Sequence, residues 1–367
     1  MPRWGHFALP VLLCLALAGC GGPKEQVKYR IAVIPKGLTH EFWQSIHRGA
    51  EQAAVDLTAQ GIPIEVIWSG PRTEDDAQAQ ITLVEQHVAA GVSGIVLAPQ
   101  HSTQMVQPVQ AAVEKGIPVV IIDSGLDDRD VIVKYIATNN YHGGQLAAEH
   151  MLNVLKAEGK NAPKLIMLRY KTGSESTDQR EKGFEDFVNL VITVQKNAGT
   201  PTITWLSTNK YAGPTTDSAL TVATPLLNSL KDEGIDGIFT PNESSATGML
   251  KALQSLGLNK KVHLVGFDAS VPLLEAMQDG DIDALIVQDP YKMGYLGVWS
   301  LVHYLEGYDV TAAGKDRGKV VGTGEHVITR TNLDARSTGE LFDPMLQGRR
   351  TMTPPAYPRK GEGHRVR

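Results

Sequence analysis

Cysteine is almost absent from the 367-residue sequence, which has only Cys14 and Cys20. If the first nineteen residues are removed, the chain can form no internal disulfide and no thiolate metal site. The sequence also has no GxxxxGKS/T phosphate-binding loop, no GxSxG motif and no HExxH helix. These absences leave no specific support for an enzyme, and none is predicted. His101 and His142 lack carboxylates or thiols at ligand spacing, so we predict no metal site.

The first twenty residues have the pattern of an export signal. Arg3 precedes the apolar run Phe7–Leu17, which is too short to span a bilayer. The run ends in Leu17-Ala18-Gly19-Cys20, which resembles the lipobox of bacterial lipoproteins. That resemblance implies a signal peptide at 1–19, lipidation of Cys20, a tether at 20–28 and a membrane as partner. The alternative is a leader cut elsewhere. We predict an exported, membrane-anchored lipoprotein in the periplasm or at the cell surface.

Neither sign of charge dominates the composition, but the charged residues are unevenly distributed along the chain. The net charge is −5, and residues 349–367 hold six Lys or Arg against one acid. Residues 20–348 are therefore strongly acidic, which argues against a nucleic-acid partner. We predict a disordered basic tail at 346–367, with contact to anionic lipid as the alternative.

The rest of the chain alternates apolar runs with amphipathic segments. With 42% apolar and 20% charged residues, it has the composition of an ordinary soluble protein. Its length suits two lobes better than one core. The stretch Ile31–Ala50 is representative, because a buried strand at Ile31–Ile34 is followed by a polar loop and then a helix from Phe42.

The pattern predicts two successive series of strands and helices. In the first series, strands are expected at 31–34, 64–68, 94–98 and 117–122, and helices at 42–59, 75–90 and 101–115. In the second, strands are expected at 164–168, 202–206, 237–240, 263–267 and 284–288, and helices at 178–188, 218–230, 246–256 and 271–278. Residues 138–140 are expected to cap a helix between the two series, and a helix at 291–306 and a strand at 325–329 follow them. Such alternation indicates an α/β fold with parallel, doubly wound sheets.

Polar residues follow many of these strands, at the sheet edge where ligands bind in parallel α/β folds. Acids and amides there can form bidentate hydrogen bonds with vicinal hydroxyls, and two neighbouring aromatic rings offer flat faces to a sugar ring. We therefore predict a site for a small sugar or polyol, without a cofactor. Its residues are Lys36, His40, Phe42, Trp43, Asp123, Ser124, Asp178, Gln179, Arg180, Pro241, Asn242, Glu243, Asp268 and Gln288.

Five segments in order resemble the type 1 periplasmic binding proteins of the ribose-binding group, which feed sugar ABC transporters. They are IAVIPKGLTHEFWQSI, GIVLAPQHSTQMVQPVQAAVEKGIPVVIIDS, TNNYHGGQLAAEHM, DGIFTPNESSATGMLKAL and VGFDASVPLLEAMQDGDIDALIVQDPYKMGYLGV. The resemblance implies two Rossmann-like lobes joined by a three-crossing hinge near Thr138, Gln288 and the stretch before Glu325. The first lobe would comprise 29–138 and 289–318, and the second 139–288 and 319–345. The implied function is a substrate-binding lipoprotein that traps sugar by hinge closure and delivers it to the membrane subunits of an ABC permease.

Carried over position by position, the family's ligand contacts fall on all the predicted site residues except Gln179, Pro241 and Glu243. Lys36 stands where the ribose pattern has a serine, His40 where it has an asparagine, and Ser124 and Asp178 where it has arginines. These differences argue against ribose. Lys36, Asp123, Asp178, Gln179 and Pro241 resemble instead the receptors for the furanosyl signal autoinducer-2, whose relatives include rhamnose-type sugar binders. Glu243 departs from that pattern, which has a small residue there.

Each site residue also has a structural alternative. Asn242, Asp268 and Asp178 can be helix N-caps, with Arg180 as the ion-pair partner of Asp178. Lys36 and His40 can be solvated loop residues, and Trp43 can belong to the core.

The whole protein also has alternative functions. As an enzyme, the chain could use Lys36 with Asp123 as a Schiff-base or acid/base pair. A sugar repressor is a further alternative, but the leader occupies the space of its DNA-binding helices. The last alternative is a receptor that presents its closed form to a membrane kinase.

Overall fold

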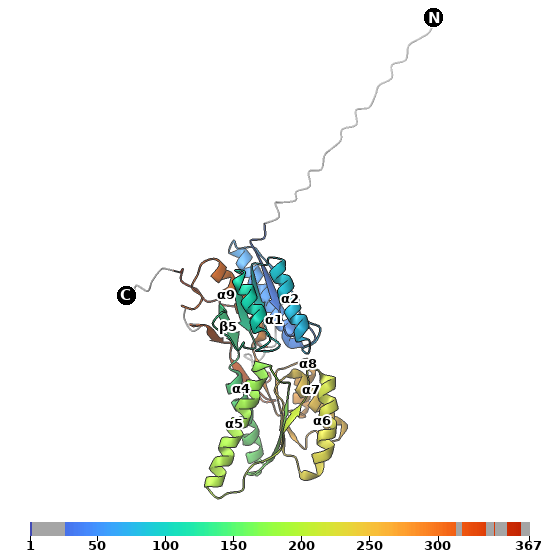
Figure 1. The fold of residues 1–367 in the computed structure, drawn as a ribbon. Coiled ribbons are helices and arrows are strands. Elements are labelled where there is room, and N and C mark those ends of the chain that lie inside the picture. Colours follow the sequence, from blue (N-terminus) through green and yellow to red (C-terminus); the bar gives the residue numbers. More distant parts are fainter. Residues whose placement is uncertain (2–25, 313–317, 335–340, 342–350, 361–367) are drawn as a thin grey trace.

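The computed structural model describes residue 1 and residues 26–312, 318–334, 341 and 351–360. Apart from residue 1, the predicted signal peptide lies outside these residues, as do the lipidation site Cys20 and most of the tether. Figure 1 shows two lobes, each built on a sheet that is covered by helices. This arrangement is the predicted α/β fold with two Rossmann-like lobes.

The first lobe contains a six-stranded parallel sheet in the order β11-β5-β4-β3-β1-β2. Buried, β-branched runs form its central strands, as expected when helices cover both faces. Its strands are β1 (Tyr29–Ile34), β2 (Ile64–Trp68), β3 (Gly94–Leu97), β4 (Val119–Ile122), β5 (Lys134–Ala137) and β11 (Val320–Gly322). Its helices are α1 (Glu41–Ala59), α2 (Ala77–Ala89), α3 (Val106–Glu114) and α9 (Pro290–Leu305).

The second lobe repeats the design with the strand order β12-β10-β9-β8-β6-β7, in which only β12 is antiparallel to its neighbour among the described strands. Its strands are β6 (Lys164–Arg169), β7 (Thr204–Tyr211), β8 (Gly237–Phe239), β9 (His263–Phe267), β10 (Ala284–Gln288) and β12 (Glu325–Ile328). Its helices are α4 (Asn140–Ala157), α5 (Glu175–Asn197), α6 (Thr216–Leu230), a 3-10 turn (Lys231–Glu233), α7 (Glu243–Ser255) and α8 (Val271–Asp279).

The chain passes between the lobes at the three predicted places. It crosses between β5 and α4, between β10 and α9, and between β11 and β12. The last crossing corrects a predicted boundary, because Val320–Gly322 pairs with β5 of the first sheet. The first lobe therefore continues to Gly322, and assignment of residues 319–322 to the second lobe was wrong. An apolar pattern of three residues carries no information about which sheet will pair with it.

Two of the described strands, β5 and the three-residue β11, were not recognised in the sequence. In β5, Lys134 precedes Tyr135, Ile136 and Ala137, so the apolar pattern is interrupted. Lys134 is nevertheless fully buried, and its ammonium donates to the backbone carbonyl of Val310 at 2.5 Å. Its charge therefore has a partner that lies far away in the sequence, and the segment can form an inner strand despite the lysine.

Two pairs of glycines allow a helix pair to pack closely in each lobe. A Cβ atom on Gly294 of α9 would lie 2.0 Å from the backbone carbonyl oxygen of Ile46 in α1, and Gly49 meets α9 in the same way. In the second lobe, Gly144 of α4 and Gly183 of α5 make the equivalent crossing. These helices begin or end at the hinge or the cleft, so their close packing positions the site.

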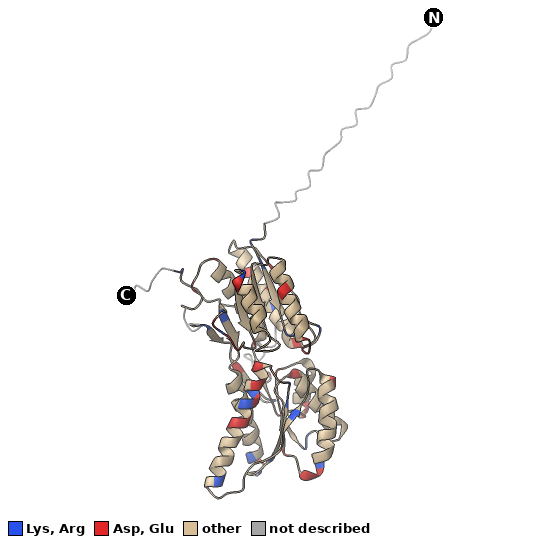
Figure 2. Ribbon diagram, viewed as in Figure 1, with Lys and Arg blue, Asp and Glu red and all other residues tan. Residues whose placement is uncertain are grey.

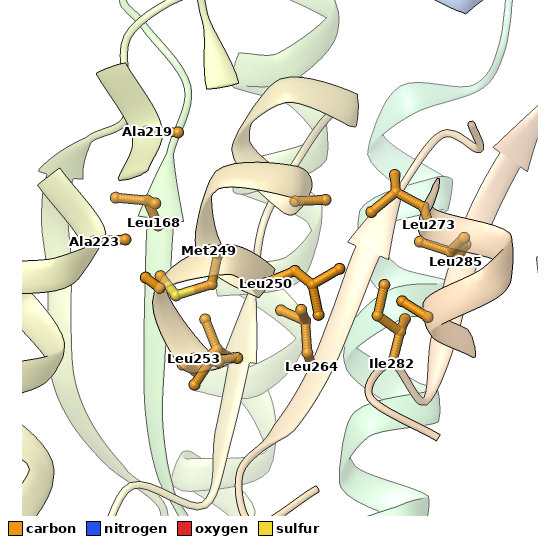
Figure 3. Close-up of a cluster of buried hydrophobic side chains, with 14 of the residues drawn as sticks. Leu168, Ala219, Ala223, Met249, Leu250, Leu253, Leu264, Leu273, Ile282 and Leu285 are labelled. Carbon is orange, nitrogen blue, oxygen red and sulfur yellow. The ribbon is translucent and has the colours of Figure 1, made fainter. Parts of the chain in front are cut away.

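Each sheet has an apolar cluster on both faces. Figure 3 shows one of the clusters, in which Met249, Leu250 and Leu253 of α7 lie against side chains from the neighbouring strands and helices. These include Leu264 of β9, which lies below Leu250 in the view. The packing of these clusters fixes the positions of the strands, and therefore also the positions at which the loops after the strands begin.

The C-terminal prediction was partly wrong. Residues 351–360 pack on the first lobe, where Tyr357 is 7% exposed and its hydroxyl lies 3.0 Å from Ser300 Oγ. The backbone N–H of Lys360 donates to Gly307, and its ammonium lies over the ring of Tyr304. Basic composition indicated a solvated tail, but the aromatic and stacking contacts that hold this segment are all distant in sequence. The remaining tail residues lie outside the described part of the chain.

Candidate functional site

A cavity lies between the lobes at the carboxyl ends of the strands. It is narrow in this structure, with a volume of about 20 Å³, which is room for about one water molecule, so a larger ligand would need its walls to move apart. Both lobes contribute to its walls, and most of its side chains are polar. The lining residues are Lys36, His40, Phe42, Trp43, Glu74, Asp123, Tyr170, Ser174, Ser176, Thr177, Arg180, Asn242, Asp268 and Gln288.

Two aspartates occupy equivalent places in the two lobes. Asp123 directly follows β4 and Asp268 directly follows β9, and both have left-handed backbones with φ of 62° and 67°. Their N–H groups donate to the adjacent strands, to Ile136 at 3.1 Å and to Ile286 at 2.8 Å. A non-glycine residue in this conformation is uncommon, and such strain concentrates at binding sites. The turn ends each strand and leaves a carboxylate in the cavity wall.

Lys36, in the loop after β1, connects the two lobes. Its side chain is 3% exposed, and Nζ lies 3.0 Å from Asp123 Oδ2 of the same lobe. The ammonium also donates to two hydroxyls of the second lobe, Ser174 Oγ at 3.2 Å and Ser176 Oγ at 3.0 Å. A buried ammonium needs such partners, because burial without them would cost several kcal/mol.

Arg180 has a similar position in the second lobe. Its Nη1 lies 3.6 Å from Asp268 Oδ2 and donates to the carbonyl of Pro241 at 2.9 Å. Its Nε donates to Asn140 Oδ1 at 2.8 Å, and the guanidinium lies over the Phe267 ring, 3.9 Å from its centroid. Arg180 is therefore held by four different groups and offers a fixed positive charge to the cavity.

Gln288, at the end of β10, has one amide atom paired and the other unpaired. Its Nε2 donates to Asp268 Oδ1 at 2.5 Å, and because a carboxylate only accepts, this bond sets the orientation of the amide. Burial raises the pKa of Asp268, while Arg180 and Gln288 act against this shift. Gln288 Oε1 is buried and accepts no hydrogen bond from any described residue. It is an acceptor in the cavity wall that requires a donor.

Glu74, in the loop after β2, is the centre of a hydrogen-bonded network. Oε1 lies 2.7 Å from His40 Nδ1 and accepts from Trp43 Nε1 at 2.9 Å, and Oε2 accepts from the hydroxyl of Tyr170 in the second lobe at 2.7 Å. Burial lowers the pKa of His40, but Glu74 outweighs this effect and raises it to about 9. Burial raises the pKa of Glu74, but His40 and Lys36 hold it well below its usual range. Both groups are charged at neutral pH.

The charges that line the cavity are balanced. Its three cations, Lys36, His40 and Arg180, pair with three carboxylates. The aromatic part of the wall comes from Phe42 and Trp43, which contact each other edge to face with centroids 4.9 Å apart. The cavity can therefore offer hydrogen bonds and apolar surface without a net charge.

Residues 31–309 match the sequence profile of the periplasmic binding protein domain family. This match covers most of the chain and agrees with the two lobes and the cleft between them. The chain belongs to the periplasmic binding protein domain family. The relatives include the D-ribose/D-allose-binding protein of Pseudomonas aeruginosa, which is 26% identical over 76% of this chain and 83% of the relative. The ribose import binding protein of Haemophilus influenzae is 28% identical over 82% of this chain and 93% of the relative.

Two solved structures of similar fold are described as transporter solute-binding proteins with a bound sugar. A carbohydrate transporter solute-binding protein from Agrobacterium radiobacter, in complex with D-arabinose, has a TM-score of 0.75 and 29% identity, over 85% of this chain and 98% of the other. An ABC transporter solute-binding protein from Agrobacterium vitis with bound D-fucose has a TM-score of 0.72 and 30% identity, over 84% and 98%. These relatives are binding proteins, which agrees with the prediction that the chain is not an enzyme.

In this periplasmic binding protein domain, most of the predicted site residues converge on the cavity. Those that line it are Lys36, His40, Phe42, Trp43, Asp123, Arg180, Asn242, Asp268 and Gln288. The structure also decides several of the alternatives. Lys36 and His40 are not solvated loop residues, and Asn242 caps α7 as well as lining the cavity. Trp43 is 2% exposed and belongs both to the core and to the cavity wall.

Five predicted residues do not line the cavity. Ser124 Oγ accepts from the N–H of Ser176, and the backbone carbonyl of Pro241 accepts from Arg180. Gln179 lines a separate groove beside the hinge. The side chains of the other two, Asp178 and Glu243, are also absent from the lining. Asp178 is on the exposed side of α5, whose N-cap is Ser174, so its suggested role as N-cap was wrong. Ser270 is likewise the N-cap of α8, in place of Asp268.

Sequence reasoning missed Glu74, Tyr170, Ser174, Ser176 and Thr177. They follow β2 and β6, whose carboxyl ends belong to the same sheet edges as the residues that were identified. Applying the strand-end rule to these two strands would have selected both loops. The rule does not say how far along the chain beyond a strand a site residue can lie. It would therefore not have shown that Glu74, ten positions after the first residue of β2, reaches the site.

Among the described residues, no group of His, Cys, Asp and Glu has the arrangement of a metal site. Within that same part of the chain, none of the helices has the length and apolarity that crossing a membrane requires.

Proposed function

We propose that this protein is the sugar-binding component of an ABC-type importer and that it encloses a small neutral sugar or polyol between its lobes. Its relatives are named for ribose and allose import, and similar structures hold D-arabinose and D-fucose. Binding in the cleft favours the closed arrangement, which the permease membrane subunits recognise. The descriptions of these relatives name import and transport, and nothing in the cavity favours a receptor for a membrane kinase instead.

The observation that supports this proposal most directly is the unpaired acceptor of Gln288. A buried carbonyl oxygen without a donor costs about 1–3 kcal/mol. A sugar hydroxyl in the cavity would supply that donor. The adjacent carboxylate of Asp268 has further acceptor capacity, so vicinal hydroxyls could bind to both residues at once.

The balanced charge supports a neutral ligand. Each cation that lines the cavity already has a carboxylate partner, at 3.0 Å for Lys36, 2.7 Å for His40 and 3.6 Å for Arg180. A sugar acid or sugar phosphate would bring a negative charge into this balanced site and leave it without a compensating cation. The cost of an unpaired buried charge exceeds that of an unpaired hydroxyl.

We further propose that the lining residues are the ligand contacts, including the five that sequence reasoning missed. Lys36 and His40 replace the residues of the ribose pattern, and both are paired deep in the wall. Their bulk and pairing support a ligand that differs from ribose in its hydroxyl arrangement. Pentoses, 6-deoxyhexoses and furanosyl compounds of the autoinducer-2 type remain candidates, because all are neutral and small.

We also propose that the protein is exported and held at a membrane by lipid on Cys20. The support is the leader and its Leu17-Ala18-Gly19-Cys20 sequence, together with the membership of a periplasmic binding protein family. Mass spectrometry of the membrane fraction tests this part directly. A diacylated N-terminal peptide that begins at Cys20 is expected, whereas an unmodified cysteine would contradict the proposal.

A thermal-shift screen tests the ligand class. Pentoses, hexoses, 6-deoxyhexoses, polyols and furanosyl signals would be compared with the sugar acids and sugar phosphates derived from them. At least one neutral compound is expected to raise the melting temperature, and its charged derivatives should have a smaller effect. A larger shift with the charged derivatives would overturn the neutral-ligand proposal, and no shift with any neutral compound would overturn sugar binding.

A matched pair of variants tests the position of the site. Gln288→Leu removes the unpaired acceptor, and loss of one hydrogen bond to a ligand should weaken binding by about tenfold. Gln179→Leu makes the same chemical change at a residue that lines the separate groove, and wild-type affinity is expected. Equal effects of the two substitutions on affinity would show that the cavity has been assigned to the wrong residues.

A further inference from the structure

Three glutamates make contacts between the lobes from outside the cavity. Each is the first residue of a helix: Glu41 of α1, Glu175 of α5 and Glu243 of α7. Each carboxylate accepts a backbone N–H from the opposite lobe, from Val271, Gly125 and Phe42 respectively. None of the three glutamates lines the cavity between the lobes. They therefore join the lobes without being placed to touch a ligand.

Glu175 makes the most extensive of these contacts. Its Oε2 accepts from the N–H of Gly125 at 2.9 Å and lies 3.2 Å from the hydroxyl of Tyr135, and its Oε1 lies 3.0 Å from Arg129 Nη2. The Arg129 guanidinium also lies over the Tyr135 ring, 4.7 Å from its centroid. All three donors belong to the first lobe, whereas Glu175 belongs to the second. Figure 2 shows acidic residues at the end of α5 nearest the first lobe.

The other two glutamates make weaker connections. The N–H of Val271 lies 3.4 Å from Glu41, near the limit for a hydrogen bond. The carboxylate of Glu243 accepts from Phe42, but its Oε2 is buried without a hydrogen bond from any described residue. Glu243 therefore bears a desolvation cost that Glu175, with donors on both oxygens, does not.

We propose that Glu175 is a positioning residue that latches the two lobes in the closed arrangement and thereby sets ligand affinity without contacting the ligand. This inference rests on the proposed function, in which the closed form retains the ligand. Opening the cleft would separate the Glu175 carboxylate from its three donors. Affinity depends on the population of the binding-competent form, so a latch outside the cavity changes the dissociation constant by the same factor as that population.

The test measures lobe closure separately from sugar binding. In the full chain with Cys14 and Cys20 replaced by serine, cysteines for spin labels would be introduced at Val55 of α1 and Leu190 of α5, which are both exposed. Double electron–electron resonance then reports the distribution of distances between the lobes. The variant is Glu175→Gln, which keeps the shape of the side chain. The matched control is Asp217→Asn, an exposed first-turn acid of α6 with no described contact to the first lobe.

Glu175→Gln is expected to increase the ratio of open to closed protein by about tenfold, because charge-assisted hydrogen bonds are replaced by weaker ones. For whichever of D-ribose, D-allose, D-arabinose and D-fucose binds, the dissociation constant should rise by the factor by which the closed population falls. Asp217→Asn should leave both quantities unchanged. Tyr135→Phe removes one donor and is expected to shift the distribution in the same direction by a smaller amount.

The outcomes separate the latch from the proposed function. If Glu175→Gln folds normally but retains the wild-type distance distribution and affinity, the latch is refuted while sugar binding stands. If no sugar binds but the substitution still opens the lobes, the latch stands and the proposed function fails. Should the variant unfold, Tyr135→Phe decides, and an unchanged distribution in that variant refutes the latch.

Discussion

Replacement of Lys36 by methionine tests the central ion pair of the cavity. The substitution preserves most of the side-chain volume but removes the ammonium that pairs with Asp123 and donates to Ser174 and Ser176. Both serines belong to the second lobe, so two charge-assisted hydrogen bonds across the cleft are lost. Asp123 is left buried without its cation when the lobes close.

The magnitude follows from these contacts. Each charge-assisted hydrogen bond contributes roughly 1.5–3 kcal/mol, and removal of one partner from a buried ion pair costs about 3–5 kcal/mol. Because the terms share one ammonium and are not additive, we expect a total of about 3–5 kcal/mol. This energy corresponds to a loss of affinity of at least about two orders of magnitude. The cost should affect closure more than folding, because an open cleft lets water solvate Asp123.

The assay is isothermal titration calorimetry with the sugar that gives the largest thermal shift, combined with thermal unfolding without sugar. Lys182→Met is the matched control, because Lys182 forms an exposed pair with Asp186 and such pairs contribute little. A double-mutant cycle with Asp123→Asn should show that the two losses are not additive. Affinity of Lys36→Met within threefold of wild type, or strictly additive losses in the cycle, would refute the role of the pair.

Three further predictions concern stability. Gly294→Ala places a methyl group 2.0 Å from a backbone carbonyl of α1 and should destabilise the protein by about 1–3 kcal/mol in chemical unfolding, whereas Gly322→Ala, with no atom within 4 Å, should not. A result in which both behave alike would contradict the close helix crossing. The pKa of His40 is raised from 6.5 to about 9 in the folded protein, so its ion pair stabilises fully below pH 6.5 and that stabilisation is lost as pH rises through 9. The melting temperature without sugar should therefore fall over this interval, and less steeply in His40→Gln; equal slopes would argue against the pair. Tyr357→Ala should cost about 2–4 kcal/mol by losing buried surface, while Tyr211→Ala, at a tyrosine that is 45% exposed, should cost much less. Equal unfolding midpoints for the two variants would show that the C-terminal segment does not stabilise the first lobe.

The fold was largely predictable because strands that helices cover on both faces need apolar residues throughout. The runs at Ile31–Ile34 and Ala284–Gln288 have this composition, and both form inner strands. The polar residues directly after such strands, including Asp123 and Asp268, were predictable for the same reason. A residue one position beyond a buried strand has little freedom, so its location follows from that of the strand.

Residues farther from a strand end were harder to place, because loop geometry decides where they point. Asp178 and Gln179 lie on α5 close to Arg180, but the helix turns their side chains away from the cavity that Arg180 lines. Neighbouring positions on a helix differ in direction by about 100°, so a correct segment does not imply a correct residue. Glu74 was missed because it lies several positions beyond the end of β2, although its loop brings it back to the cleft.

The sequence by itself determined the two-lobed α/β fold and the strand ends that bear the site, because these depend on local patterns of apolar and polar residues. The three crossings were implied by the resemblance to a known family. Only the tertiary structure decided which polar groups form pairs. The contact of Lys36 with Ser174, of Glu74 with Tyr170, and of Glu175 with Gly125 joins residues of different lobes. Such contacts depend on the orientation of the two lobes relative to each other. No periodic pattern of apolar and polar residues in the sequence indicates that orientation.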